Sequence, residues 1–241
     1  MRGLAPFWID PGDNTCQFPD VRLALDEPDG LLAVGGDLRP ERLMAAYRRG
    51  IFPWYNDDQP ILWWAPNPRA VLFPQHLKIS RSLRKTLRRA PFRVSADTAF
   101  DAVIEACSQP REAGGQRQTG TWITEDMKQA YRRLHALGVA HSVECWRDDT
   151  LVGGLYGIAL GRVFFGESMF SRCSDASKVA FVHLVRQLAR WDFALIDCQV
   201  ASPHLSSLGA ETIPRDTFGA LLERHAVPPD QPGRWRLAPP S

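Results

Sequence analysis

Residues 141–199 carry the pattern that most restricts how this chain can fold. Three consecutive apolar segments of this region are typical of strands: His141–Arg147, Leu151–Leu160 and Arg162–Met169. The turn-forming residues Asp148-Asp149 and Gly161 separate them, so neighbouring segments are expected to form hairpins. A helix is predicted from about Ala176 to Trp191, followed by a buried strand at Phe193–Ile196. We therefore expect an α+β fold.

The order of three antiparallel strands, a helix and a further strand resembles the core of acetyltransferase-like (GNAT-type) domains. We expect this domain to span residues 73–241. Residues 1–72 are expected to form a smaller N-terminal α/β lobe, which begins in a stretch rich in Pro, Gly and Asp. Its helix is predicted to start at Pro40 and to end at Gly50. Trp63 and Trp64 are interpreted as an aromatic core of this lobe.

Two polar side chains end the last buried strand, in the sequence Leu195-Ile-Asp-Cys-Gln199. Successive side chains of a strand point to opposite faces, so Asp197 and Gln199 are predicted to share one face and Cys198 to point to the other. A carboxylate beside a carboxamide at the mouth of a strand can orient and polarise a weak nucleophile. Asp197 and Gln199 are therefore catalytic candidates, and the alternative is a structural Asp197 that holds a loop in place.

Glu167 interrupts an otherwise apolar strand, where an acid is costly to bury without a partner. One interpretation pairs it with Arg162 or Arg172 at the sheet edge, and the other makes it a carboxylate that receives a substrate ammonium. Unless Gly166 forms a bulge, strand alternation predicts two faces: Phe165, Glu167 and Met169 on one, and Phe164, Ser168 and Phe170 on the other.

The predicted helix after Ser80 carries an unbalanced positive charge. Its basic residues recur at helical spacing on one face: Arg81, Arg84, Lys85, Arg88 and Arg89. Leu83 and Leu87 are expected to face the core, and no acid on this helix relieves repulsion that costs ~0.2–0.5 kcal/mol per pair. The net charge of the whole chain is only +2. We therefore expect a polyanion such as a nucleic acid to bind this helix.

Two further helices are expected before the strands. The first covers Asp97–Cys107 and is followed by a polar loop at residues 108–120. Thr124 is a suitable N-cap for the second, which ends at Gly138. The apolar residues of the second helix are predicted to face inward: Met127, Tyr131, Leu134 and Leu137.

Composition argues against several functional classes. The five Cys are scattered and the six His form no HxxxH pair, which favours reduced thiols in the cytoplasm and argues against a metal site. No apolar run approaches the ~20 residues of a membrane span. The segment Ser171–Lys178 lacks the glycine-bearing turn that binds the pyrophosphate of coenzyme A, so acetyl-CoA is not the expected donor. We expect a monomer with no cofactor and no metal.

Six ordered motifs resemble a single family. They are Gly30–Leu38 (GLLAVGGDL), Tyr47–Trp54 (YRRGIFPW), Trp63–Arg69 (WWAPNPR), Gly120–Thr124 (GTWIT), Gly166–Ser171 (GESMFS), and Asp197–Gln199 (DCQ) with Ser207–Ala210 (SLGA). Together they are similar to leucyl/phenylalanyl-tRNA–protein transferases. The resemblance implies transfer of Leu or Phe, with Met as a further candidate, from aminoacyl-tRNA to proteins with N-terminal Arg or Lys. That transfer marks the acceptors for degradation in the N-degron pathway.

The resemblance also implies roles for individual residues. Asp197 and Gln199 match a catalytic pair in which the carboxylate polarises the amide. The other matches are Trp54 and Trp122 for the terminal adenosine, Leu155, Phe164 and Met169 for the transferred side chain, Glu167 as a substrate-contacting acid, and Arg81, Lys85, Arg88 and Arg89 for tRNA. The chain departs from the family in a longer loop before Trp122, and in Leu155, which stands where Met is common.

Two other functions stay open at this point. One is a tRNA-dependent ligase that acts on peptidoglycan precursors and shares the general fold. The other is a non-catalytic RNA-binding module. Transfer from charged tRNA to a peptide that begins with Arg would distinguish the three.

Overall fold

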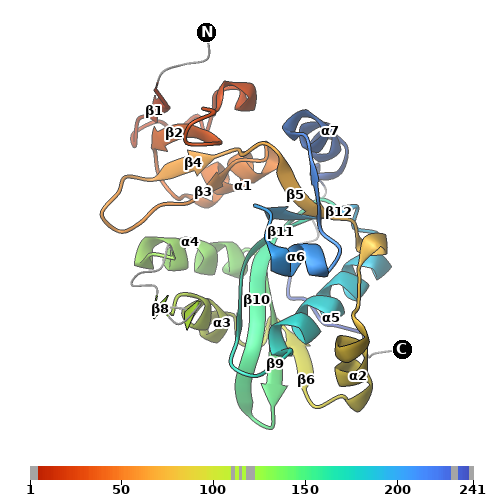
Figure 1. The fold of residues 1–241 in the computed structure, drawn as a ribbon. Coiled ribbons are helices and arrows are strands. Elements are labelled where there is room, and N and C mark those ends of the chain that lie inside the picture. Colours follow the sequence, from red (N-terminus) through yellow and green to blue (C-terminus); the bar gives the residue numbers. More distant parts are fainter. Residues whose placement is uncertain (1–4, 110–111, 114–115, 118–122, 229–232, 239–241) are drawn as a thin grey trace.

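The computed structural model describes residues 5–109, 112–113, 116–117, 123–228 and 233–238. A small sheet and a large sheet organise the described residues. Figure 1 shows the small sheet and helix α1 (Pro40–Arg48) at one end of the molecule, beyond the large sheet and its covering helices.

Seven strands form the large sheet in the order β13-β5-β12-β11-β10-β9-β6. Their bounds are β13 Glu211–Ile213, β5 Arg69–Leu72, β12 Leu195–Gln199, β11 Val163–Ser171, β10 Thr150–Leu160, β9 Ala140–Arg147 and β6 Arg93–Ala96. β11 and β12 are parallel, and the other neighbours are antiparallel. Helix α5 (Ala176–Arg190) connects β11 to β12. The predicted α+β fold and its acetyltransferase-like order of three antiparallel strands, helix and strand are therefore confirmed.

Helices cover both faces of the large sheet. α5 and α2 (Arg81–Arg89) lie on one face, and α3 (Phe100–Cys107) and α4 (Glu125–Ala136) lie on the other (Figure 1). An apolar core fills each side. α6 (Pro203–Ser207) and α7 (Arg215–His225) follow β12, and β7 (Glu112–Ala113) pairs with β8 (Gln116–Arg117). Within the described ranges no helix is long and apolar enough to cross a membrane.

The small sheet has the order β1-β2-β4-β3. Its strands are β1 Phe7–Ile9, β2 Leu31–Gly35, β4 Leu62–Trp64 and β3 Phe52–Pro53. Trp63 is fully buried, donates its indole N–H to the Gly35 carbonyl at 2.9 Å and meets the Phe18 ring edge-on, which confirms its place in an aromatic core. Because β5 already belongs to the large sheet, the chain enters that sheet before residue 73. The domain boundary at residue 72 stays a prediction.

One predicted helix start is confirmed, a second helix begins later than predicted, and one side chain at the end of a third helix is exposed instead of inward. α2 starts as predicted, because the Ser80 hydroxyl accepts the Leu83 N–H at 3.2 Å. α3 begins only at Phe100, since Asp97 has a left-handed backbone (φ 53°) and its carboxylate accepts the Ser142 N–H instead of starting a helix. The inward orientation of Leu137 is wrong: this side chain is 54% exposed because it follows the last turn of α4.

A bulge in β11 changes which side chains share a face. Tyr156 pairs with Ser168 while Gly157 pairs with Gly166, so Glu167 is an extra residue without an opposite partner. The extra residue shifts the alternation by one position. Residues on the α5 face are Phe164 and Met169, whereas those on the α3–α4 face are Phe165 and Phe170. The alternation predicted for a strand without a bulge therefore does not apply here, and Met169 shares a face with Phe164 instead of Phe165.

The C-terminal segment 233–238 returns to the large sheet and buries Trp235. The Trp235 ring stacks on His141 with 3.8 Å between ring centroids and meets Trp191 edge-on at 5.0 Å. Its backbone N–H donates to the Asp97 carboxylate at 2.7 Å. The segment is thus held by both apolar packing and a buried acceptor.

Replacing Trp235 by Ala should lower the free energy of unfolding by about 3–5 kcal/mol, because it empties a large buried site. Urea unfolding followed by circular dichroism measures this change. Trp8→Ala is the matched control, since the Trp8 side chain is 69% exposed and its loss should leave the midpoint within experimental error. Equal midpoints for the two variants would contradict the role given to Trp235.

Candidate active site

A buried ion pair joins β5 to β12. The Arg69 guanidinium donates to both carboxylate oxygens of Asp197, with distances of 2.8 and 2.6 Å. Both side chains are almost completely buried, and the guanidinium carbon lies 4.8 Å from the ring centroids of both Phe52 and Phe218. This bidentate arrangement compensates the charge of Asp197 and fixes the orientation of its carboxylate.

The strand is irregular directly after Asp197. Asp197 pairs with Val71 and Gln199 pairs with Ala70, so Cys198 is the extra residue of a second bulge. Gln199 has a left-handed backbone (φ 61°), and its N–H donates to Asp197 Oδ1 at 2.9 Å. Cys198 packs against the apolar core on the α5 side, away from Arg69, as the alternation predicts. Burial raises the pKa of the Cys198 thiol, which makes it a poor nucleophile.

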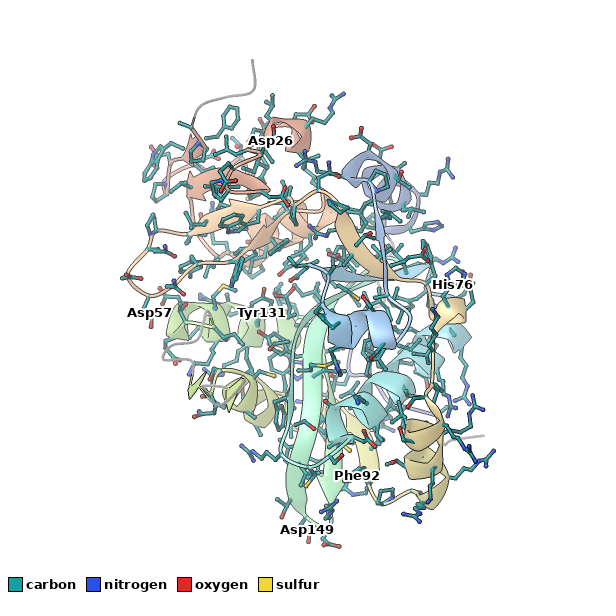
Figure 2. The ribbon with its side chains drawn as sticks, viewed as in Figure 1. Asp26, Asp57, His76, Phe92, Tyr131 and Asp149 are labelled. Carbon is teal, nitrogen blue, oxygen red and sulfur yellow. The ribbon has the colours of Figure 1, made fainter. Side chains whose placement is uncertain are left out.

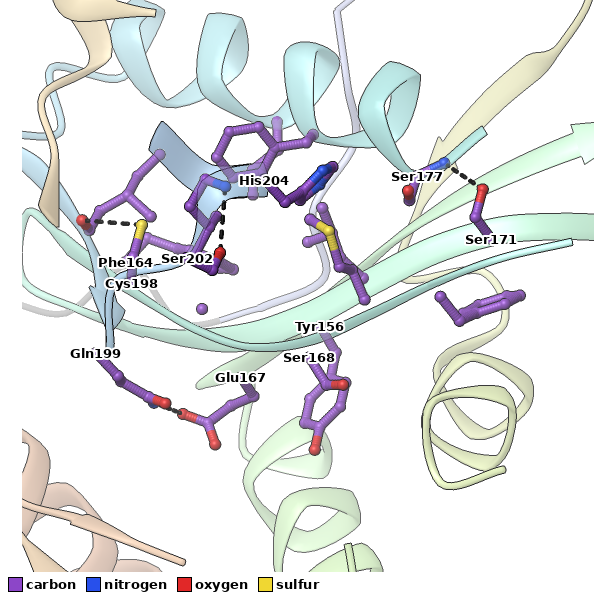
Figure 3. Close-up of a pocket in the computed structure, with 18 of the residues that line it drawn as sticks. Tyr156, Phe164, Glu167, Ser168, Ser171, Ser177, Cys198, Gln199, Ser202 and His204 are labelled. Carbon is purple, nitrogen blue, oxygen red and sulfur yellow. Dashed lines mark hydrogen bonds between the residues drawn. The ribbon is translucent and has the colours of Figure 1, made fainter. Parts of the chain in front are cut away.

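Glu167 is the centre of a hydrogen-bond cluster built from four elements. Its Oε1 accepts the Tyr47 hydroxyl of α1 at 2.8 Å and the Gln199 side-chain amide of β12 at 2.9 Å. Its Oε2 accepts the Tyr131 hydroxyl of α4 at 2.7 Å. Figure 2 places Tyr131 midway along the molecule, beneath the small sheet, and Figure 3 shows Glu167 reaching Gln199.

Burial raises the pKa of Glu167 to about 7, although the hydrogen bonds from Tyr131 and Tyr47 act in the opposite direction. The same cluster raises the pKa of both tyrosines well above 10, because burial and the nearby Glu167 disfavour a phenolate. Both tyrosines are therefore hydrogen-bond donors at neutral pH.

The structure contradicts one interpretation of these acids and shows which partner the Gln199 side chain has. Glu167 does not pair with a sheet-edge arginine: Arg162 pairs with Asp192 at 2.6 Å, and Arg172 donates to the Leu151 carbonyl at 3.2 Å. Asp197 does not contact the side-chain amide of Gln199. The amide donates to Glu167 instead, because the left-handed turn at Gln199 directs its backbone, rather than its side chain, toward Asp197.

A cavity of about 780 Å³ opens beside these groups. Its apolar lining includes Leu155, Phe164, Met169, Phe181, Leu184 and Ile196, and its polar lining includes Glu167, Asp197, Gln199, Ser177 and His204. Figure 3 shows Phe164 and Cys198 on the α5 side of the strands and the Glu167–Gln199 bond on the other. The residues that line the cavity thus include both apolar residues and residues with carboxyl and amide groups.

The remaining predicted site residues are elsewhere. Trp54 is 47% exposed, its ring lies 5.8 Å from that of Trp64, and it does not line this cavity. Trp122 lies outside the described residues.

The predicted tRNA-binding side chains are all exposed on α2: Arg81, Arg84, Lys85, Arg88 and Arg89. Leu83 anchors α2 in the core, and Thr86 donates to Asp175 at 2.9 Å. Within the described residues no acidic side chain pairs with the five basic ones.

Sequence reasoning missed three residues of the site. Arg69 was visible as a charged residue at the start of the apolar run Ala70–Phe73, directly after a Pro-rich motif. Tyr131 is predicted among the inward residues of its helix, and only the tertiary fold brings its hydroxyl next to that of Tyr47. Among the side chains that the structure describes, no group of three His, Cys, Asp or Glu could hold a metal ion.

Comparisons with known proteins identify many similar sequences. The leucyl/phenylalanyl-tRNA–protein transferase of Aromatoleum aromaticum is 65% identical over 218 residues, which cover 90% of each chain. That of Cellvibrio japonicus is 57% identical over 234 residues, or 97% of each chain. The L-PGS of Bacillus licheniformis is a solved structure with 10% identity and a TM-score of 0.38, and the similarity covers 71% of this chain and 54% of that one.

Two family descriptions match this chain. The N-terminal domain of leucyl/phenylalanyl-tRNA protein transferase matches residues 36–67, and the main domain of the same family matches residues 71–223. Asp197 lies within the second matched range, whereas its partner Arg69 lies between the two ranges. They include both tyrosines, Glu167 and Gln199. The chain belongs to the leucyl/phenylalanyl-tRNA protein transferase family.

Proposed function

We propose that the protein transfers Leu or Phe, and also Met, from aminoacyl-tRNA to the N-terminal Arg or Lys of acceptor proteins. This transfer would mark the acceptors for degradation by the N-degron pathway, in the cytoplasm. Family membership supports the reaction class. The observation that carries the proposal is a single cavity in which an apolar part adjoins a carboxylate and an amide.

The apolar part suits the side chain of the donor. Leu155, Phe164 and Met169 line it, and they exclude a charged side chain because desolvation without a partner is costly. An aminoacyl ester is already activated toward an amine, so the enzyme needs to position its substrates more than to form a covalent intermediate. The half-buried Cys198, whose raised pKa makes its thiol a poor nucleophile, agrees with direct transfer.

The polar part suits a basic acceptor. Arg69 compensates the charge of Asp197, whereas no cationic side chain among the described residues pairs with Glu167. A substrate that brings its own cation would complete this part of the cavity. We propose that Glu167 receives a positive group of the acceptor, and that Asp197 and Gln199 act as the catalytic pair.

The exposed basic face of α2 supports a tRNA donor. Phosphate oxygens are the natural partners of a lysine- and arginine-rich surface that lacks acids. We propose that Trp54 and Trp122 stack on the terminal adenosine, for which the exposed ring of Trp54 is suited. Assay of transfer from Leu-tRNA to an Arg-initiated peptide tests the whole proposal. An RNA-binding module would bind the tRNA without transfer, and a ligase for peptidoglycan precursors would not modify the peptide.

Gln199→Ala should reduce the transfer rate at least about tenfold, or ~1.4 kcal/mol of barrier, because it removes the amide beside the reacting groups. Cys198→Ala is the matched control, since it changes the neighbouring residue on the opposite face and should keep most activity. Single-turnover transfer to an Arg-initiated peptide measures both. An active Gln199 variant together with an inactive Cys198 variant would reverse the assignment.

Neutralising Arg84, Lys85, Arg88 and Arg89 to Gln together should raise KM for charged tRNA and flatten its salt dependence, because each lost phosphate contact reduces the logarithmic salt slope by about one. The same variant should use a minimal aminoacyl-adenosine donor as well as wild type does. Identical salt slopes for variant and wild type with full tRNA would remove α2 from the interface.

Met169→Ala should increase the use of Phe relative to Leu, because it enlarges the apolar part of the cavity. A single methylene is worth only ~1–3 kcal/mol, so the expected change is in the ratio of donors rather than in absolute activity. Competition between Leu-, Phe- and Ile-charged tRNA measures this ratio. Met44→Ala, a half-buried Met in α1 that does not line the cavity, is the control. An unchanged ratio in the Met169 variant would place selectivity elsewhere.

A further inference from the structure

Three oxygen-bearing groups form a closed ring beside the cavity. The hydroxyl oxygens of Tyr47 and Tyr131 are 2.5 Å apart. Tyr47 is 2.8 Å from Oε1 of Glu167, and Tyr131 is 2.7 Å from Oε2. Each member is therefore within hydrogen-bond distance of the other two.

The number of protons in this ring depends on the state of Glu167. If the carboxyl group is ionised, the ring holds two protons, and both tyrosines donate them to Glu167. The two phenol oxygens then face each other at 2.5 Å with no hydrogen between them, which is unfavourable. If Glu167 is protonated, the ring holds three protons and every side has one: Glu167 to Tyr131, Tyr131 to Tyr47, and Tyr47 back to Glu167. The geometry therefore fits one additional proton.

The surroundings agree with a proton held at this position. Among the described residues, Asp197 of β12 disfavours a second negative charge on Glu167 and is itself paired with Arg69 of β5. Titratable phenols face it from α1 and α4, and Tyr156 of β10 packs edge-on against Tyr131 at 5.4 Å. Gln199 donates a further hydrogen bond. The resulting pKa of about 7 allows Glu167 to gain and lose a proton near neutral pH.

We propose that Glu167 is the proton acceptor of the transfer reaction and takes a proton from the N-terminal ammonium of the acceptor. Tyr47 and Tyr131 are positioning residues that hold its carboxyl group in both protonation states. The inference rests on the proposed function, because it needs an acceptor amine at this end of the cavity. It gives Glu167 a chemical role in addition to the recognition of a cation.

The step balances as follows for each transfer. The ammonium loses one proton to the Glu167 carboxylate and becomes an amine. Its electron pair forms the N–C bond to the ester carbonyl carbon, and the ester C–O3′ bond breaks with its electrons on O3′. O3′ takes a second proton from the same nitrogen, which yields the amide and the free 3′-hydroxyl. The proton on Glu167 returns to water when the product leaves.

The pH dependence of kcat/KM for Leu transfer to an Arg-initiated peptide tests the proposal. Wild-type activity should fall as pH decreases through about 7, because a protonated Glu167 cannot accept a proton. Glu167→Gln should lose this fall and be at least about tenfold slower at pH 8. The titration of the peptide amine is common to all variants and cancels in the ratio to wild type. A Glu167→Gln profile that parallels wild type would overturn the proposal.

Variants of the two tyrosines test the proposal independently, through the direction in which the pH profile shifts. Tyr47→Phe and Tyr131→Phe each remove a hydrogen bond that stabilises ionised Glu167, so the fall in activity should move to higher pH. Tyr55→Phe is the matched control, because this buried tyrosine faces Thr124 at 3.4 Å and does not touch Glu167. A shift toward lower pH, or an equal shift in the control, would contradict the role of Tyr47 and Tyr131 as hydrogen-bond donors to ionised Glu167.

Thermal unfolding provides a measurement that needs no tRNA. The pKa of Glu167 is raised from 4.5 to about 7 in the folded protein, so its contribution to stability is complete below 4.5 and is lost as pH rises toward 7. The Tm of Glu167→Gln minus that of wild type should therefore increase between pH 5 and 8. If this difference in Tm is constant between pH 5 and 8, Glu167 is not the proton acceptor, even if transfer occurs. If it increases but wild type transfers nothing, the proposed function fails instead.

Discussion

The buried Arg69–Asp197 pair is the interaction on which the site depends. Each charge alone would cost several kcal/mol to bury, and loss of one partner would leave the other uncompensated at a cost of about 3–5 kcal/mol. The pair is bidentate, and the guanidinium also lies between Phe52 of the small sheet and Phe218 of α7. One side chain therefore connects β5, β12, α7 and the N-terminal part. It also holds the turn that presents Gln199, since Asp197 accepts the Gln199 N–H.

The site contains two acids in different environments. An arginine compensates Asp197, whereas the donors to Glu167 among the described residues are hydroxyl and amide groups. Such a difference assigns separate tasks to neighbouring carboxyl groups: Asp197 pairs with Arg69 and supports the backbone of Gln199, and Glu167 can exchange a proton. Gln199 joins the two because its backbone contacts Asp197 and its side chain contacts Glu167. Changes at either acid are therefore expected to reach the other through this residue.

Two bulges in adjacent strands shape the cavity. The bulge at Glu167 moves Met169 to the face of Phe164, so that both can line the apolar part. The bulge at Cys198 gives Gln199 the left-handed conformation that directs its amide to Glu167. Bulges often occur where a sheet must redirect a side chain. Regular strands at these two positions would separate the groups that here meet in one cavity.

The sequence by itself determined the order of the strands and helices, the basic face of α2, the opposite directions of Asp197 and Cys198, and the family. These features depend on local periodicity, turn residues and short motifs, which neighbouring residues specify. The face of Met169, the Arg69–Asp197 pair and the Tyr47–Tyr131–Glu167 ring were decided only by the tertiary structure. Strand alternation cannot locate a bulge, and partners up to 128 residues apart in sequence meet only when β5, β12 and the helices pack together.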